Sequence, residues 1–451
     1  MRLRLLSPVL LLLLSGCTLT PDYERPALDI PEAYVQPSDG GASIANLEWW
    51  KLFSDTQLQY LIRTALAENR DLRASLQRIR EARAFLTFTR ADQYPFIDGS
   101  ASVSRERPSK ILFPGSDTSN NYSLSADLSF EVDLWGKLRR ATEAAQSDLL
   151  ATEAAYRNVT ISLVANVASA YFLLRDLDGR LQISRDTVKS RTESLKIIQA
   201  RFDKGTVPEL DVNQAEIELA IAEAAVSAFE RQTVQAENAL QFLLGRNPGP
   251  IQRGLPLEQQ VMPSDIPVGL PSELLQRRPD LVEAEERLIS ETALIGVAEA
   301  LRYPSIGLTG SLGLLSDDFS DLTDSDAKTW SIAGGLFAPI FNSGQLKAQA
   351  EGQRARTEQA MAAYESALLQ AFREVEDSLI AIRTYNSEHA ARLRQARAAR
   401  NAARLSRARY DGGVVDYLEV LDSERSLFNA DLEQSVTMRQ NLHSGIEVYT
   451  G

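Results

Sequence analysis

The stretch Tyr122-Ser-Leu-Ser-Ala-Asp-Leu-Ser-Phe-Glu-Val-Asp-Leu134 alternates apolar and polar residues without interruption. Side chains of a strand point alternately to its two faces, so this period of two predicts a strand of about a dozen residues. One face of the strand is wholly apolar, and the other carries Asp127, Glu131 and Asp133. Such a strand covers a soluble core or faces lipid around a polar interior, and the alternation alone allows both.

Four segments of the chain predict strands, at about 96–105, 121–134, 304–315 and 329–340. Four strands cannot close a barrel, and an open sheet in lipid leaves the backbone groups at its edges unpaired. If this sheet lies in a membrane, the chain must therefore oligomerise. Two copies would supply eight strands and close a plugged barrel, whereas three copies would leave an open bore.

The chain also repeats itself at an offset of about 208 residues. Tyr94-Pro95-x-Ile97 recurs as Tyr303-Pro304-x-Ile306, and Arg201-Phe-Asp-Lys-Gly205 recurs as Arg409-Tyr-Asp-Gly-Gly413. Repetition at a fixed offset indicates a duplicated structural unit. We therefore expect two repeats.

The predicted domain boundaries follow from this duplication. The first repeat is expected at 56–245 and the second at 280–444, with a short tail at 445–451. The intervening segment, 246–279, is rich in proline, which predicts an extended linker along a surface.

Each predicted pair of strands is followed by a long stretch of good helix formers. Proline is absent between Pro114 and Pro208 and again after Pro339, while Ala, Glu, Arg, Gln and Leu are abundant. One glycine-bearing turn interrupts each stretch. We therefore expect helical hairpins at about 137–244 and 345–443, with long arms of about 60 residues, or about 90 Å.

The first residues predict export. Arg2 and Arg4 precede an apolar run, Leu5 to Leu14, that is too short to cross a bilayer as a helix. It ends in Leu14-Ser-Gly-Cys17, which resembles the bacterial lipobox, where the cysteine is diacylated through its sulfur, the signal is cut before it, and the new amino group is acylated. We expect a signal peptide at 1–16 and an acylated segment at 17–55. Cys17 would carry palmitate, whose chain inserts into the membrane lipid. In bacterial lipoproteins an Asp directly after the acylated Cys usually signals retention in the inner membrane. Here that residue is Thr18, which favours the outer membrane.

Composition excludes several functional classes. The formal net charge of −13 argues against nucleic acid as a partner, because such surfaces need clustered Lys and Arg. One Cys and two His cannot build a zinc cage or a disulfide framework. No GxSxG, GxxxxGK[ST] or HExxH motif is present. We therefore expect no enzyme activity, no catalytic residues, no cofactor and no metal site.

Several stretches together resemble one family, the outer-membrane efflux ducts of the TolC and OprM type, in the lipoprotein branch that serves resistance-nodulation-division pumps. The resemblance covers essentially the whole mature chain. Its most specific stretches are Trp49-Trp-x-x-Phe-x-Asp-x-x-Leu58, Ala65-Leu-x-x-Asn-x-Asp-Leu72, Phe130-Glu-Val-Asp-Leu-Trp-Gly-Lys137, Leu270-Pro-Ser-Glu-Leu-Leu-Gln-Arg-Arg-Pro-Asp-Leu281 and Tyr417-Leu-x-Val-Leu-Asp-x-x-Arg-Ser-Leu427.

The resemblance implies a mainly α fold with a small membrane β-sheet, in which two tandem repeats each supply a helix, two strands and a long helical hairpin. A homotrimer would form a 12-strand barrel in the bacterial outer membrane and a helical tunnel in the periplasm. It would be a passive exit duct fed by a periplasmic adaptor protein and a proton-driven inner-membrane pump, with its cargo undefined. The alternative is a lipid-anchored periplasmic coiled-coil scaffold without channel activity.

The resemblance also implies a closed periplasmic end. Leu418 and Asp422 match the leucine and aspartate rings of the family's constriction, and Leu210 is the equivalent of Leu418 in the first repeat. Arg409 and Tyr410, beside the second turn, are expected to hold the gate shut.

The two hairpin turns are expected to dock the adaptor. Their residues are Gly205 and Thr206 in the first repeat, and Gly412, Gly413 and Val414 in the second. Thr206 with Glu209, and Asp416 with Glu419, fit helix-capping boxes in which the first residue caps the following helix.

Overall fold

The structure is a computed structural model of the 451-residue chain that describes residues 23–27, 31, 34–35, 53–260 and 274–450. Cys17 and the predicted signal peptide lie outside the described residues. The chain divides into two compact units. The first contains Met1–Leu28, Gln77–Ala154 and Val282–Ser366, and the second contains Asp29–Leu76, Ala155–Leu281 and Ala367–Gly451.

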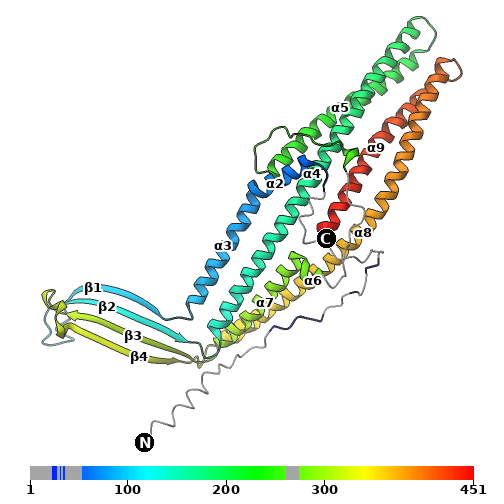
Figure 1. The fold of residues 1–451 in the computed structure, drawn as a ribbon. Coiled ribbons are helices and arrows are strands. Elements are labelled where there is room, and N and C mark those ends of the chain that lie inside the picture. The colour runs from blue at the N-terminus through cyan, green and yellow to red at the C-terminus, as the bar shows by residue number, and fades with distance from the viewer. Residues whose placement is uncertain (1–22, 28–30, 32–33, 36–52, 261–273, 451) are drawn as a thin grey trace. The chain divides into compact units, whose positions relative to one another are not determined.

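The first unit contains one antiparallel sheet with its four strands in sequence order (Figure 1). The strands are β1 (Phe96–Glu106), β2 (Ser119–Val132), β3 (Ser305–Ser316) and β4 (Lys328–Phe337). The central pair, β2 and β3, joins the two repeats, with Leu124 opposite Leu314 and Phe130 opposite Leu308. Two short 3-10 helices, η4 (Ser320–Thr323) and η5 (Ser325–Ala327), connect β3 to β4.

Helices continue from the sheet in both repeats. They are α3 (Arg70–Ala91) and α4 (Lys137–Asp203) in the first repeat, and α7 (Pro279–Ala300) and α8 (Gln345–Asp411) in the second. Within the first unit, Arg25 of the N-terminal segment makes a bidentate ion pair with the buried Glu285 of α7, at 2.6 and 2.7 Å. This clasp fixes the described part of the N-terminal segment to the second repeat.

The second unit contains the two hairpins. The helices α5 (Glu209–Leu243) and α9 (Tyr417–Thr450) run back from the turns that end α4 and α8, and the two turns lie at the same end of the unit (Figure 1). The shorter elements are α2 (Thr56–Glu68), η2 (Leu257–Gln259) and α6 (Leu274–Arg277).

The main core of the second unit is formed where α2 packs between the hairpins. Leu58 and Ile62 of α2 are fully buried against Tyr171 of α4 and Leu240 of α5. Below them, the buried Asp55 caps α2 by accepting from the Gln57 amide at 2.8 Å.

Asp55 also fixes the linker. Its carboxylate accepts hydrogen bonds from the Tyr171 hydroxyl at 2.7 Å, the Leu255 amide at 2.9 Å and the Gln260 side chain at 2.8 Å. The described part of the proline-rich linker is thus pinned to the core, with Ile251 and Leu257 buried, and does not simply run along a surface.

The predicted fold class is confirmed in its mainly helical content, its four-stranded sheet and its two repeats. The long arms α4 and α8 have the same length, 67 residues, which is about 100 Å. The predicted tail at 445–451 is different, because α9 continues as a helix to Thr450. No helix breaker occurs in α9 between Tyr417 and Thr450 apart from Gly445, which the buried helix tolerates.

Candidate functional site

The first feature of the site is an apolar face of the sheet. None of the residues that the structure describes covers this face. Over the middle of the sheet the cross-strand neighbours on this face are apolar, and Leu312 lies opposite Trp330 and Gly310 opposite Ile332. At the loop end of the sheet, Lys328 lies opposite Leu314. Trp330 is 73% exposed and Ile332 is 82% exposed. A continuous apolar surface of this kind marks contact with lipid or with another protein.

The opposite face of the sheet is polar and internally hydrogen-bonded. Ser100 lies 2.8 Å from Ser125, and Ser102 lies 2.7 Å from Ser123, between hydroxyl oxygens on β1 and β2. The Ser125 hydroxyl also donates to Asp127 at 2.7 Å. A sheet with one apolar and one polar exposed face is typical of a membrane barrel with an aqueous lumen.

Strand length and aromatic residues agree with a membrane sheet. The four strands have 11, 14, 12 and 10 residues, and about 9–11 are needed to cross a bilayer. Aromatic pairs flank β2 and β3 at both ends. Trp135 lies 5.0 Å from Tyr303 at the helix side, and Tyr122 lies 5.7 Å from Phe319 at the loop side, between ring centroids. Barrels carry such aromatic girdles at both interfaces.

The hairpin turns are the second feature, and they have the same geometry in both repeats. Gly205 and Gly413 have φ of 72° and 73°, a left-handed conformation that glycine adopts without strain. The amide of Thr206 donates to the Arg201 carbonyl at 3.0 Å, and that of Val414 donates to the Arg409 carbonyl at 2.9 Å. These bonds complete a Schellman motif at the end of each long arm.

One of the two predicted capping boxes is wrong. The Thr206 hydroxyl donates backward to the Arg201 carbonyl at 2.8 Å, so it closes the end of α4 and does not cap α5. The residue at the N-cap of α5 is Pro208, which has no side-chain donor or acceptor. Asp416 does directly precede α9, but the Glu419 carboxylate pairs with Arg409 at 2.9 Å.

The predicted gate residues project from the helices near the turns. Leu418 and Leu210 are each 62% exposed, and Asp422, one helical turn beyond Leu418, is also exposed. Their neighbours Tyr417 and Leu421 are buried against Ile198 of α4. The gate residues therefore lie on the side of the hairpins that points away from this small core.

The two predicted gate links differ in what they join. Arg409 binds Glu419 within its own hairpin. Tyr410 instead connects the hairpins, because its ring packs on Tyr417 at 5.3 Å and lies under the Arg201 guanidinium of α4 at 4.7 Å. Arg201 also approaches Asp411 at 3.8 Å.

A buried charge network near the turns has no signal in the sequence. Arg191 of α4 and Glu218 of α5 form an ion pair of 3.0 Å with both side chains 4% exposed. Arg425 of α9 donates from Nε to the same carboxylate at 2.9 Å. Glu218 therefore joins the two hairpins. Arg425 belongs to a recognisable motif, but its partners lie far away in the sequence and no motif contains them.

A second pair extends this network. Arg407 of α8 donates to the Ser194 hydroxyl of α4 at 2.8 Å and approaches Glu424 of α9 at 3.4 Å. Burial raises the pKa of the Glu424 carboxyl, although Arg407 opposes the shift. Burial likewise lowers the pKa of the Arg191 guanidinium, although Glu218 opposes the shift.

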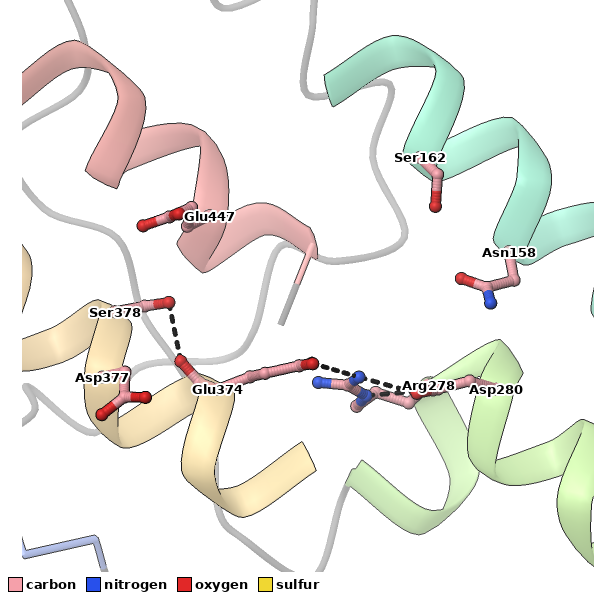
Figure 2. A pocket seen from close by; sticks show the side chains of 8 residues that line it. All are labelled: Asn158, Ser162, Arg278, Asp280, Glu374, Asp377, Ser378 and Glu447. Carbon is pink, nitrogen blue, oxygen red and sulfur yellow. Dashed lines mark hydrogen bonds and ion pairs between the residues drawn. The ribbon is translucent and has the colours of Figure 1, made fainter. Parts of the chain in front are cut away.

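A polar hollow lies elsewhere in the second unit (Figure 2). Arg278 extends between two helices and pairs with Asp280 of α7 and Glu374 of α8, both at 2.7 Å. Asp377 and Glu447 also line the hollow. Among the described residues, no group of three or more His, Cys, Asp and Glu side chains is arranged to hold a metal ion. The Arg278 pairs connect the start of the second repeat to its long arm.

A family model described as outer membrane efflux protein matches residues 61–246 and 270–449. The chain belongs to the outer membrane efflux protein family. It is 35% identical to the toluene efflux pump outer membrane protein TtgI of Pseudomonas putida, covering all of this chain and 97% of that protein. It is also 35% identical to the cation efflux system protein CusC of Escherichia coli strain K12, covering 92% of each.

Solved structures agree with this assignment to the outer membrane efflux protein family. The open state of the Neisseria gonorrhoeae MtrE outer membrane channel superposes with a TM-score of 0.87 at 32% identity, covering 96% of this chain and 98% of that one. The resemblance found in the sequence is thus confirmed. The protein is an outer-membrane efflux channel protein and not an enzyme, and the alternative of a scaffold without channel activity is not supported.

Proposed function

We propose that three copies of this chain form a passive exit duct through the outer membrane. The observation that carries the proposal is the sheet, which has two exposed faces of opposite polarity and, in the described residues, two outer strands with one unpaired edge each. Pairing β4 of one copy with β1 of the next would satisfy these edges. Three copies would give twelve strands, enough for an open bore.

In this arrangement the apolar face contacts lipid and the serine-rich face lines the bore. Ser100, Ser123, Ser125 and Asp127 would present hydroxyl and carboxylate groups to water. The long arms would continue the bore into the periplasm. Relatives of equal identity are named for toluene and for cations, so the proposal includes no specific cargo.

The gate of this duct would lie at the hairpin turns. Leu418 and Asp422, with Leu210 beside them, would form rings of apolar side chains and carboxylates when three copies meet. Three like charges around a narrow bore repel one another unless they bind a proton or a cation. Tyr410 supports closure, because its contact with Arg201 of α4 ties the second hairpin to the first, while its ring packs on Tyr417 within its own hairpin. Arg409 acts within its own hairpin by fixing Glu419.

The partners of the duct would be a periplasmic adaptor protein and a proton-driven inner-membrane pump. The adaptor would dock at the exposed turns, Gly205 and Thr206 in one repeat and Gly412, Gly413 and Val414 in the other. The two turns have matching glycine φ angles and matching backbone hydrogen bonds, which supports an adaptor that binds both turns in the same way. Acylation of Cys17 would anchor each copy, since several acyl chains together hold a protein stably at a membrane.

Two measurements on the purified protein test the proposal. The mass of the detergent-solubilised protein, corrected for bound detergent, should be three times that of one chain. Insertion into planar bilayers should give single-channel conductance steps. A monomer that retains its strand content, or a trimer that never conducts, would contradict the duct.

A further inference from the structure

The helices at the two sides of the hairpin pair carry opposite charge. Between His389 and Tyr410, α8 contains seven Arg and neither Asp nor Glu. On α5, Glu209, Glu216, Glu223, Glu230 and Glu237 recur at every seventh residue. Seven residues are almost two helical turns, so these glutamates follow one another along one face of α5.

Four of the seven arginines of α8 are already paired with carboxylates of α9. The pairs are Arg392 with Glu433, Arg400 with Asp431, Arg407 with Glu424 and Arg409 with Glu419. The other three, Arg394, Arg397 and Arg404, are exposed and have no carboxylate partner among the residues that the structure describes. We call these three the basic stripe.

The glutamates of α5 divide in the same way. Glu230 pairs with Arg185 of α4, and Glu237 pairs with Arg253 of the linker. Glu209, Glu216 and Glu223, nearer the turn, are exposed and have no cationic partner in the described part of the chain. We call these three the acidic stripe.

The two stripes cannot meet within one chain, because α9 lies between their helices. Arg425 of α9 binds Glu218 on the buried side of α5, whereas Asp431 of α9 binds Arg400 of α8. Figure 1 shows α5 and α8 on opposite sides of α9, and both segments belong to the second unit.

The stripes match in height above the turns. Arg404 lies seven residues before the end of α8 at Asp411, and Glu216 lies seven residues after the start of α5 at Glu209. Arg397 and Glu223 lie fourteen residues from the same points, so the two pairs stand about 10 Å and about 21 Å from the turns. The two turns lie at nearly the same level, because Arg201, two residues before the end of α4, lies over the Tyr410 ring at 4.7 Å and approaches Asp411 at 3.8 Å at the end of α8.

Apolar side chains lie next to both stripes. Ile217 and Ile221 of α5 are exposed beside the acidic stripe, and Leu405 of α8 is exposed beside the basic stripe. An apolar seam flanked by opposite charges is the pattern by which helices of a coiled coil choose their partner and their register.

We propose that the basic stripe of one copy of this chain contacts the acidic stripe of a second copy, with Arg404 facing Glu216 and Arg397 facing Glu223. The inference rests on the proposed trimer and names its contact between hairpins. The stripes lie on different helices, so each copy uses two different surfaces and the contact is head-to-tail. Repeating such a contact closes a ring of three copies when each copy is rotated by about 120° from the one before. The charges fix the register and disfavour wrong neighbours more than they add affinity.

Disulfide cross-linking tests the contact directly. Ala220 of α5 and Asn401 of α8 are exposed, lie within the stripes and stand eleven and ten residues from their turn ends. The chain contains one native cysteine, Cys17, which the proposed acylation would block. In outer membranes under mild oxidation, the Ala220→Cys/Asn401→Cys protein should give covalent dimers and trimers in high yield.

The matched control moves one cysteine by two heptads along the same helix. Ser387, fourteen residues before Asn401 on α8, is also exposed and lies about 21 Å farther from the turn. Cysteines that far apart cannot form a disulfide. The Ala220→Cys/Ser387→Cys protein should therefore remain uncross-linked, and equal cross-linking of both proteins would overturn the proposed register.

Charge reversal gives a second, independent readout. Glu216→Arg with Glu223→Arg should lower the trimer yield several-fold, and so should Arg397→Glu with Arg404→Glu. Combining all four substitutions restores opposite charges and should recover most of the trimer. Failure of the combined variant to recover, while each double variant is impaired, would overturn the pairing.

The outcomes separate this inference from the proposed duct. A conducting trimer in which Ala220→Cys/Asn401→Cys never cross-links would overturn the stripe contact and leave the duct in place. Cross-links from these positions to the adaptor, in place of a second copy, would also overturn it. A monomer without conductance would contradict the duct, and the stripe contact with it.

Discussion

The carboxylate of Glu218 lies 3.0 Å from the guanidinium of Arg191, and both side chains are almost completely buried between the arms of the first hairpin. A third charge, Arg425, reaches this carboxylate from the second hairpin. The Glu218 backbone carbonyl also accepts from Arg191. One residue of α5 thus bears a large part of the connection between the two hairpins of a chain.

Glu218→Ala should strongly destabilise the hairpin region, by about 3–5 kcal/mol, because it removes the carboxylate that forms an ion pair with the buried Arg191. Limited proteolysis of the purified protein across a denaturant series would measure this loss. Glu193→Gln, an exposed position on α4, should change stability by about 0.5 kcal/mol or less. Equal protease resistance of the Glu218→Ala and parent proteins would show that the buried pair is dispensable.

Glu424 should make stability depend on pH in an unusual direction for a carboxylate. Burial raises its pKa, so the folded protein binds this proton more readily than the unfolded chain does. The contribution of Glu424 to stability therefore decreases as pH rises through the folded-state pKa. In Glu424→Gln this dependence is removed, so the melting temperature of the variant relative to the parent should be higher at pH 7.5 than at pH 5. The opposite trend would mean that the Arg407 pair outweighs burial.

Leu418 and Asp422 should control two different barriers of the duct. Leu418→Ala removes apolar bulk and should raise basal conductance in planar bilayers. Asp422→Ala removes three carboxylates from the proposed ring and should weaken block by divalent or hexammine cations more than it alters conductance. The charge effect should shrink in high salt, since screening acts over about 10 Å at 0.1 M. If both variants match the parent in conductance and block, the constriction lies at another level.

The turns offer a matched pair of glycine substitutions. Gly413→Val forces a β-branched residue into a left-handed conformation and should weaken cross-linking of the adaptor while trimers remain. Gly412→Ala is the control, because Gly412 is not in that conformation and an added Cβ would meet only ordinary contacts at 3.5 Å. Adaptor cross-linking that is unchanged in Gly413→Val would place docking elsewhere on the hairpins.

Cys17→Ser should abolish labelling of the protein by radioactive palmitate. Trimers should still form, because strand pairing in the barrel would hold the copies together without the anchor. Labelling that persists in this variant would refute acylation at Cys17, since the chain has no second cysteine.

The sequence revealed those features that repeat or alternate. The alternation from Tyr122 to Leu134 predicted β2 to within a few residues, because a two-faced strand has a strict period. The recurrence of Arg201–Gly205 at Arg409–Gly413 predicted two hairpin turns, and both have the same hydrogen bonds. Alternation and repetition in the sequence therefore predicted the strand and the two hairpin turns.

Features that depend on distant partners could not be read in this way. Glu218 meets Arg425 across 207 residues, and a lone glutamate in a glutamate-rich helix gives no hint of burial. Thr206 followed a capping pattern, but the hydroxyl bonded backward, because Pro208 and not Thr206 occupies the cap of the next helix. Local patterns locate the turns well, whereas the contacts between hairpins need the folded structure.

The equal length of α4 and α8 constrains how this protein can change in size. Each residue inserted into one arm alone would shift its turn by about 1.5 Å along the helix and separate Tyr410 from Arg201. A longer or shorter arm is therefore compatible with these contacts only if the same number of residues changes in both repeats. The length of the long arm is encoded twice in the same chain, once in each repeat. A family member with longer arms would therefore need two insertions of equal length, one in each repeat.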